Sequence, residues 1–311
     1  MAGAWTAVRP VSAQQRGYPS QPIRFIVPFT PGGSNDVVAR VLGERLSAKW
    51  GQPVVVENRP GASGNIGAEA VARAAPDGYT WLLGANQIFT TNSHLLRGSF
   101  DALRDLALVA RLAVVPVVLV AHPGVPVTSV QDLVALAKRR PGTLAYPSSG
   151  VGSFQHLGLA RLLGQDATHV PYRGASALLP DLLAGRVQVF AGAVNTLLPH
   201  VRSGKLKALA VMGSSRTPSL PDVPTVAEAG FPDARTDIWL SVAVPAATLR
   251  PVVEHVYDGV AGVILLPEVR AELAKQGIEP ALQPSAELTA TVRREHASDG
   301  ELIARLGICA D

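Results

Sequence analysis

The chain has 311 residues, of which 47% are hydrophobic and 17% charged, and its formal net charge is +4. This composition provides enough apolar side chain for two modest cores and excludes a disordered chain. The low net charge, without any run of five basic residues, argues against a nucleic-acid partner. The single cysteine, Cys309, excludes an internal disulfide and a cysteine metal cluster.

The first seventeen residues resemble the end of a secretory signal. Residues 11–13 (Val-Ser-Ala) have the small side chains that signal peptidase reads, but the basic start and the apolar middle are short or missing. A plain disordered N-terminus is the alternative interpretation. No apolar run along the chain reaches the roughly 18–20 residues of a membrane span.

The next segment combines a strand, a glycine turn and a helix start. Residues 24–27 predict an apolar strand, residues 28–33 a turn with two prolines and two glycines, and residues 36–49 a helix with residues 34–36 as candidate N-caps. Such a turn leaves backbone N–H groups pointing at one place near the positive end of the helix dipole. The segment therefore predicts a site for a small anion, without a lysine as a point charge.

Strand and helix patterns alternate along the rest of the chain, and this alternation predicts an α/β fold with mostly parallel sheets. Strands are expected at 54–56, 80–83, 114–121, 143–146, 169–172, 187–191 and 207–211, and helices at 66–75, 130–140, 154–163 and 177–184. From about residue 248 the pattern is mainly helical, with an apolar closing helix at 302–308.

A second glycine turn repeats the layout of the first. The strand at 143–146 enters residues 147–153 (Pro-Ser-Ser-Gly-Val-Gly-Ser), and a helix follows from 154. Because ligands bind at the carboxyl ends of strands in open α/β sheets, the two turns predict a cleft that is lined from both sides.

Enzyme motifs are incomplete. The dinucleotide fingerprint, the Walker A loop and the nucleophile elbow are absent, and the seven histidines never lie within five residues of one another, which excludes helical zinc spacing but not a scattered site. Ser148, Ser149 or Ser153 could pair with His156 as nucleophile and base. The alternative is that the serines cap the helix while His156 packs or faces the cleft.

Several motifs together resemble one family. They are 26–29 (Ile-Val-Pro-Phe), 31–33 (Pro-Gly-Gly), 76–80 (Pro-Asp-Gly-Tyr-Thr), 169–172 (His-Val-Pro-Tyr) and 220–225 (Leu-Pro-Asp-Val-Pro-Thr). In this order they are similar to the Bug-type (TctC-like) receptors, the extracytoplasmic solute-binding proteins of the tripartite tricarboxylate transporter family. The resemblance extends from about residue 18 to 280.

The resemblance implies a type II periplasmic binding protein: two α/β domains joined by crossover strands, with a ligand cleft between them. Domain 1 would comprise residues 18–121 and 237–311, and domain 2 residues 122–236, after a signal remnant or disordered segment at 1–17. The protein would be a periplasmic monomer, would not be an enzyme, and would need no metal or cofactor. Its partners would be membrane permease subunits or, alternatively, a signalling partner.

The family's ligands imply a small carboxylate, such as a dicarboxylate, a tricarboxylate, an amino acid or an aromatic acid, held mainly by backbone N–H groups. Matching positions place Phe29, Thr30, Gly32, Gly33 and Asp36 in the first loop, Ser148, Ser149, Gly150, Val151, Gly152, Ser153 and His156 in the second, and Asn86, Tyr172, Arg173, Gly174 and Asn195 around them. The sequence does not identify which carboxylate is bound.

Three positions leave alternatives open. Arg173 either pairs with a second acidic group of the ligand or faces solvent. Ser241 stands where the family often has glycine, and residues 296–300 replace a tryptophan-containing helix. The last two departures concern the packing of the C-terminal part more than ligand binding.

Overall fold

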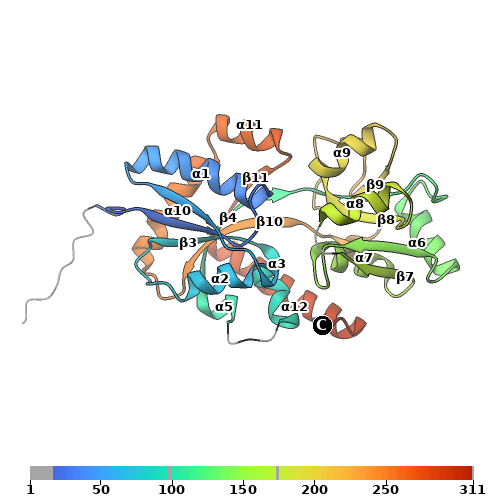
Figure 1. The fold of residues 1–311 in the computed structure, drawn as a ribbon, viewed down its shortest axis with the longest axis horizontal. Helices are drawn as coiled ribbons and strands as arrows, with labels where there is room; N and C mark the ends of the chain where they lie inside the picture. Colours follow the sequence, from blue (N-terminus) through green and yellow to red (C-terminus); the bar gives the residue numbers. More distant parts are fainter. Residues whose placement is uncertain (1–16, 97, 99, 173–174, 310–311) are drawn as a thin grey trace, which may run out of the picture.

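The computed structural model describes residues 17–96, 98, 100–172 and 175–309, which form two α/β lobes (Figure 1). The first lobe contains a six-stranded sheet in the order β11-β4-β10-β3-β1-β2. Its strands are β1 Ile23–Val27, β2 Val54–Asn58, β3 Thr80–Ala85, β4 Leu106–Val115, β10 Ile238–Pro245 and β11 Glu279–Pro284. Its helices are α1 Ser34–Trp50, η1 Ala62–Gly64, α2 Asn65–Ala72, α3 Asn86–Thr90, α4 Asn92–Leu95, α5 Ala102–Asp105, α10 Arg250–Ile264, α11 Pro267–Lys275 and α12 Ser285–Leu306.

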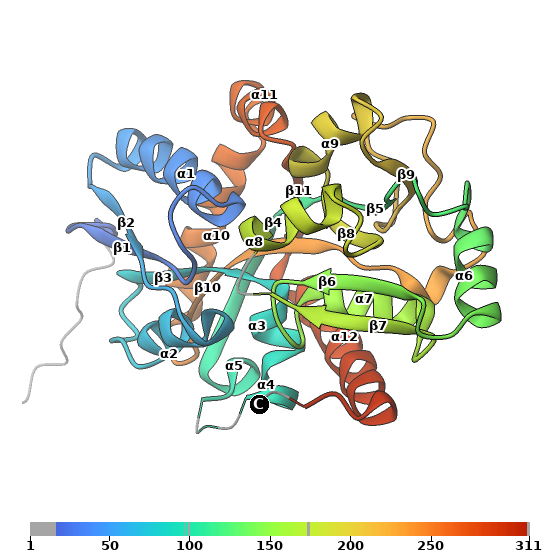
Figure 2. The same cartoon turned by 45° about the vertical axis from the view of Figure 1, so that its right-hand side comes forward.

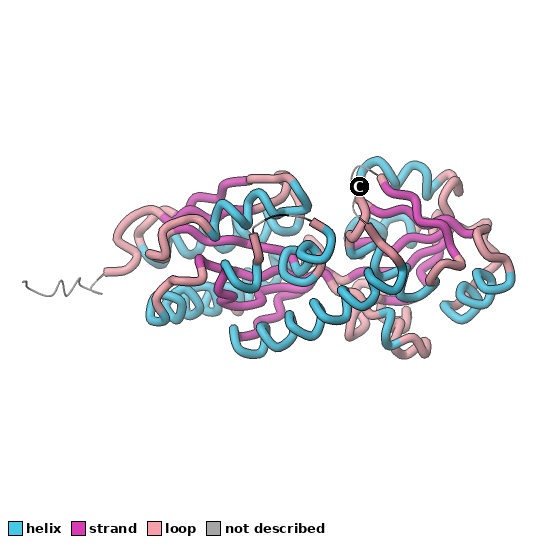
Figure 3. Tube along the Cα trace, turned by 90° about the horizontal axis from the view of Figure 1, so that it is seen from below, coloured by secondary structure: helices cyan, strands magenta, loops and turns pink. Residues whose placement is uncertain are grey.

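The second lobe contains a three-stranded sheet in the order β8-β5-β9 and the pair β6-β7. Its strands are β5 Val117–Ala121, β6 Leu144–Ser148, β7 Ala167–Pro171, β8 Val189–Ala193 and β9 Lys207–Val211. Its helices are α6 Val130–Arg139, α7 Phe154–Leu163, α8 Ala175–Leu183, α9 Val194–Arg202 and η2 Pro232–Ala234. Seen from below, the strands gather in two groups, each flanked by helices (Figure 3). The predicted α/β class is confirmed.

The prediction of mostly parallel sheets is wrong. Among the strands of the described residues, only β1–β2, β1–β3 and β6–β7 pair in parallel. Strand β10 is antiparallel to β3 and β4, β11 is antiparallel to β4, and β5 is antiparallel to β8 and β9. The chain leaves the first lobe through β4 and returns through β10, so these neighbours run in opposite directions.

The predicted strand at 114–121 is two strands. Pro116 separates β4, which pairs in the first sheet, from β5, which pairs in the second. Proline has no N–H to donate to a ladder, so it suits the point where the chain changes sheets. The predicted domain boundary after Ala121 assigned β5 to the first domain, but its partners β8 and β9 place it in the sheet of the second lobe.

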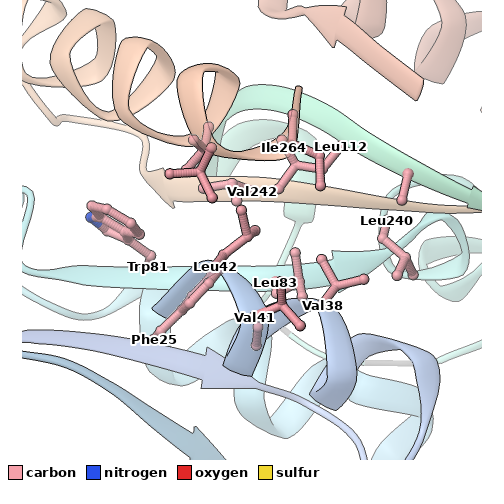
Figure 4. Packing of buried hydrophobic residues seen from close by; sticks show 14 of the residues in the cluster. Phe25, Val38, Val41, Leu42, Trp81, Leu83, Leu112, Leu240, Val242 and Ile264 are labelled. Atoms are coloured by element: carbon pink, nitrogen blue, oxygen red, sulfur yellow. The ribbon is translucent and has the colours of Figure 1, made fainter. Parts of the chain in front are cut away.

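The large sheet of the first lobe is covered on both faces. On one face, Figure 4 shows Leu42 of α1 and Ile264 of α10 packed over Phe25, Trp81 and Val242 of the sheet. Helices α2 and α12 pack on the other face. Every residue of β1 except Arg24 and every residue of β3 are buried, as expected for strands between two helical layers. Full burial of each such side chain stabilises the lobe by roughly 1.5–3 kcal/mol. This core holds the carboxyl ends of β1 and β3 in fixed positions.

Helix α12 connects the lobes away from the crossover strands. It packs along the first lobe and its C-terminal half lies beneath α7 of the second (Figure 2). Leu302 and Ile303 form an apolar cluster with Leu157 of α7, and Asp299 pairs with Arg161 of the same helix. The helix runs without interruption through residues 296–300, so this departure from the family pattern is accommodated in a continuous helix.

Candidate functional site

The first predicted loop joins β1 to α1. Helix α1 begins at Ser34 and its N-cap is Gly33, in extended conformation and without a side-chain cap bond. The prediction that Ser34, Asn35 or Asp36 is the N-cap is therefore wrong: these residues form the first turn of the helix. Gly32 has φ +85°, a left-handed conformation that glycine adopts without strain.

Asp36 holds this loop in place. Its Oδ2 accepts hydrogen bonds from Gly32 N (3.0 Å) and Arg40 Nε (2.9 Å), and its Oδ1 accepts one from Asn58 Nδ2 (2.9 Å). The Arg40 guanidinium, the Gly32 amide and the Asn58 amide lower the pKa of Asp36 to about 2. Asn58 also donates to Phe29 O (3.2 Å), so it fixes both ends of the loop. We call this set the Asp36 network.

The start of α1 presents backbone donors. Within the described residues, the N–H groups of Gly33, Ser34 and Asn35 have no protein acceptor, as is usual for a helix start. Gly32 and Gly33 are exposed, as is Thr30, while Phe29 is half-buried against the first core. The loop thus offers N–H groups at the positive end of the helix dipole.

The second predicted loop joins β6 to α7. Ser153 is the N-cap of α7: its Oγ accepts from His156 N (3.4 Å) and donates to Gly150 O (2.7 Å). Gly150 and Gly152 have φ +139° and +75°. Their N–H groups point into the loop, because Gly150 N donates to Ser148 Oγ (3.1 Å) and Gly152 N donates to His156 Nδ1 (3.1 Å). The N–H groups of Val151 and Phe154 have no acceptor within the described residues.

Two histidine rings lie beneath this second loop. His156 of α7 and His169 of β7 stack with their ring centroids 3.6 Å apart and their planes 6° from parallel. His169 Nε2 lies 2.6 Å from Ser148 Oγ. Burial and the neighbouring His169 ring lower the pKa of His156 to about 4, and burial also lowers the pKa of His169. Both rings are therefore neutral at pH 7.

This geometry does not form the Ser–His156 pair of the hydrolase alternative. The Nδ1 atom of His156 accepts from a backbone amide, and the Ser153 hydroxyl caps the helix, as the alternative reading of the sequence expected. Ser148 does contact a histidine, His169, but it is fully buried under the loop and its hydroxyl is bonded within it. A substrate carbonyl has no access to this hydroxyl.

Three further predicted residues make contacts elsewhere. Asn86 Nδ2 donates to Asp237 O (3.0 Å) at the return crossover. Tyr172 donates to Asp181 Oδ2 (2.7 Å), and Asn195 Nδ2 donates to Gln276 O (2.8 Å), which links α9 to the first lobe. Arg173 and Gly174 lie outside the described residues, as do residues 1–16 of the predicted signal remnant.

A cavity of about 840 Å³ lies between the lobes on the side of α12. Its walls come from α3, α7, η2, the start of β10 and α12, and Asn86 is the predicted site residue among them. It contains exposed arginines beside Asp237 and Glu295, and burial raises the pKa of both carboxyl groups. The charges in this cavity are mixed, and none of the glycines of the two turns is among its lining residues. The two loops, which present backbone N–H groups at helix starts without fixed charges, are therefore the better candidate site for a carboxylate.

No helix in the described ranges is long and apolar enough to cross a membrane. Among the same residues, no group of three or more histidine, cysteine, aspartate or glutamate side chains could hold a metal ion.

Comparison with known proteins identifies the family. Residues 38–308 match the model of the tripartite tricarboxylate transporter family receptor. The chain belongs to this family. BugT of Bordetella pertussis is 42% identical over 77% of this chain and 74% of its own length.

Two solved structures with bound ligands share the fold of this receptor. R. palustris Rpa4515 with adipate is 34% identical and covers 94% of this chain and all of its own, with a TM-score of 0.81. MatC of Rhodopseudomonas palustris with bound malate is 29% identical and covers 92% of this chain and all of its own, with a TM-score of 0.76.

The family confirms the predicted type II periplasmic binding fold and the expectation of a solute-binding receptor rather than an enzyme. The receptors of this family are periplasmic, so the chain functions outside the cytoplasm.

The residues that the sequence analysis did not single out are those that support the two loops from behind. Asn58 is the last residue of β2, and His169 lies within β7 in the motif His-Val-Pro-Tyr of the family resemblance. A polar side chain in or at the end of a strand was the available signal in each case. The residues that these side chains contact are distant in sequence and could not be inferred.

Proposed function

We propose that this receptor captures a small dicarboxylate between the β1–α1 and β6–α7 loops, mainly through backbone N–H groups, and delivers it to the permease of a tripartite tricarboxylate-type transporter. One jaw comprises residues 18–116 and 237–311, and the other residues 117–236. The observation that supports this proposal most is that each lobe has a glycine turn at the carboxyl end of a strand, followed by a helix with unpaired N–H groups.

The donors on each side are backbone groups. Gly33, Ser34 and Asn35 contribute from the first lobe, and Val151 and Phe154 from the second. Neither loop, residues 28–36 or 148–156, contains a lysine or arginine. The nearest arginine on α1, Arg40, is already paired with Asp36. Recognition therefore depends on N–H groups and helix dipoles, which favour anions without a fixed cation.

The magnitudes are sufficient for a transport receptor. Micromolar affinity corresponds to about −8 kcal/mol. Each charge-assisted hydrogen bond to a carboxylate contributes roughly 1.5–3 kcal/mol. A helix N-terminus adds about 0.3–1 kcal/mol, and up to ~2 where it is partly buried. At the upper end of these ranges, four such donors, the two helix N-termini and burial of the ligand in a closed cleft together reach the required value after the loss of ligand freedom is subtracted.

A dicarboxylate fits the two-sided arrangement. The ligands named for Rpa4515 and MatC, adipate and malate, each carry two carboxylate groups. With one carboxylate on each loop, the ligand contacts both jaws at once. Because only the closed state offers both sets of donors, such a ligand shifts the population toward closure.

Isothermal titration with adipate, malate and hexanoate tests the proposal. Hexanoate has the same carbon chain as adipate and lacks one carboxylate, so it is the matched control. We expect micromolar binding of at least one dicarboxylate and binding of hexanoate weaker by at least tenfold. Equal affinity for adipate and hexanoate, or no response to any of a wider panel of dicarboxylates, would contradict the two-loop arrangement.

A further inference from the structure

The β6–α7 loop is bonded to two histidines, one on α7 and one on β7. His156 Nδ1 accepts from Gly152 N, and His169 Nε2 contacts Ser148 Oγ, which in turn contacts both the N and the O atom of Gly150. The two rings stack face to face, with His156 buried and His169 half-buried, and the Tyr146 ring lies 5.3 Å from that of His169. Each glycine of the loop is thus tied to one histidine.

The protons can be assigned from the number of contacts around Ser148 Oγ. This atom has one hydrogen and three partners: Gly150 O at 2.8 Å, Gly150 N at 3.1 Å and His169 Nε2 at 2.6 Å. Gly150 O is an acceptor only, so the hydroxyl donates to it. Gly150 N–H donates to Oγ, and the remaining contact requires His169 to carry its proton on Nε2 and to donate it to Oγ. Every contact then has one hydrogen.

The same reasoning fixes the state of His156. Its Nδ1 accepts a hydrogen bond, so the proton of the neutral ring is on Nε2. A proton on Nδ1 would face the Gly152 N–H and break this bond. Two charged rings at a separation of 3.6 Å would also repel each other strongly in a buried place.

The charged groups on neighbouring elements are engaged elsewhere. Arg161 of α7 is paired with Asp299, and Asp181 of α8 is bonded to Tyr172 and Arg186. Tyr146 is the titratable group whose ring lies against the pair, and burial raises its pKa to about 12. It therefore stays neutral, and among the described residues no counter-charge compensates a proton on the histidines.

We propose that His169 is a positioning residue of the carboxylate site: acting through Ser148 on Gly150, and stacked on His156, it holds the β6–α7 loop in its binding conformation. The inference rests on the proposed function and assigns a role to a residue of β7. Gly150 and Gly152 turn their N–H groups inward onto this support, and Val151 and Phe154 keep theirs for the ligand. A preset loop binds more tightly, because less ordering is needed on binding.

The test compares three variants of the full chain. His169→Gln places an amide N–H near the position of Nε2 and keeps the donor, whereas His169→Leu fills the space without one. His200→Leu is the control, since the His200 ring has no hydrogen bond or ring contact within the described residues. Adipate and malate affinities are measured by titration, and amide hydrogen exchange is measured by mass spectrometry on peptides that cover residues 148–157.

For His169→Leu we expect binding of adipate or malate to weaken about tenfold and exchange in residues 148–157 to accelerate in the ligand-free protein. His169→Gln should restore both to within about threefold of the wild type, and His200→Leu should change neither. Unchanged exchange in His169→Leu, or equal effects of the Leu and Gln variants, would overturn the inference.

The two proposals can fail separately. If the wild type binds neither dicarboxylate, the proposed ligand class is wrong, but the exchange measurement still decides whether His169 positions the loop. Should His169→Leu not fold, Ser148→Ala removes the same link with a smaller change and is expected to accelerate exchange in the same peptide. Unaltered exchange in Ser148→Ala would then overturn the inference.

Discussion

The two loops of the receptor share a layout and differ in how they are held. The β1–α1 loop is fixed by the Asp36 network, in which a carboxylate accepts from Arg40, Gly32 and Asn58 and the arginine is half exposed. The β6–α7 loop is fixed by a stacked pair of neutral histidines, of which His156 is buried and His169 is half-buried, and by a buried serine. At neutral pH the Asp36 network holds its loop because Asp36 and Arg40 are ionised. The histidine pair holds its loop because both rings are uncharged.

This difference has a functional consequence for a ligand that is an anion. A carboxylate that approaches the second loop meets backbone N–H groups over neutral rings, so its affinity there does not depend on a cation. At the first loop the Asp36 charge lies behind the amides and is neutralised by Arg40. In both cases the protein presents dipoles rather than net charge, and this suits reversible binding in a transport receptor.

The largest expected effect on the second loop comes from Gly152. Its φ of +75° disfavours any side chain, and a Cβ there would overlap Cδ1 of Leu95 in the first lobe. Gly152→Ala should weaken adipate or malate binding by well over tenfold, because the positive φ and the overlap with Leu95 together favour a shift of the loop, which breaks its bond to His156. Gly142→Ala is the matched control, since Gly142 has φ +76° and open space around it.

Both alanine variants should lose about 1 kcal/mol of unfolding free energy from the backbone strain, but Gly142→Ala should bind as the wild type does. Titration and chemical denaturation measure the two effects. If Gly142→Ala weakened binding as much as Gly152→Ala, general strain rather than the β6–α7 loop would explain the result.

The histidine pair and the Asp36 network should lose their contributions to the free energy of unfolding in separate pH ranges. Between pH 6.5 and 4 the unfolded chain carries a proton on His156 that the folded chain excludes, because the folded pKa is lowered to about 4. The free energy of unfolding therefore falls as the pH falls through this window, by about 3 kcal/mol at most. The Asp36 contribution remains until the pH falls from its ordinary pKa of 3.8 toward 2, and amounts to about 1 kcal/mol after screening of the half-exposed Arg40.

Denaturant titrations at pH 7, 5.5 and 4.5 measure the upper window. His156→Asn is the control, since the Asn Oδ1 can accept from Gly152 N at the place of Nδ1 and does not titrate. We expect a shallower loss of stability for this variant than for the wild type. Parallel curves for the two proteins would show that His156 does not change its protonation on unfolding.

Local sequence patterns predicted much of the fold and the position of both loops. Alternation of apolar runs and turns located β1, β3, α1, α6 and α7, and the glycines marked where strands end. Strand direction was not predictable in this way, because β10 enters the first sheet from the other lobe and its antiparallel pairing with β3 and β4 depends on the crossover. Pro116 lies where the chain changes sheets, but the apolar residues on both sides of it predicted one continuous strand.

The supports of the loops were predicted least. Asp36 was expected at a helix cap, and only the folded loop shows that it reaches back to Gly32 and across to Asn58 on β2. His156 was identified from its place after the glycine turn, whereas its stacking partner His169 is on a different element. Both cases depend on contacts between strands that are adjacent in space and distant in sequence.

The smallest of the expected effects isolates a single donor of the first loop. Gly33 has φ −78°, which proline can adopt, so Gly33→Pro removes one N–H with little change in backbone conformation. One charge-assisted hydrogen bond of roughly 1.5–3 kcal/mol corresponds to a loss of about tenfold or more in dicarboxylate affinity. Gly33→Ala keeps the N–H, and its Cβ would lie 3.8 Å from Thr30 O, an ordinary contact.

Both variants therefore add a side chain at residue 33, but only Gly33→Ala keeps the N–H donor. Titration with adipate and malate should show weaker binding for Gly33→Pro and near wild-type binding for Gly33→Ala, with similar thermal midpoints for both. Equal affinities would mean that the Gly33 N–H does not contact the ligand. In that case Ser34 and Asn35, at the first turn of α1, would be the remaining donors on this side, and the contribution of the first lobe would depend more on the helix dipole than on the glycine turn.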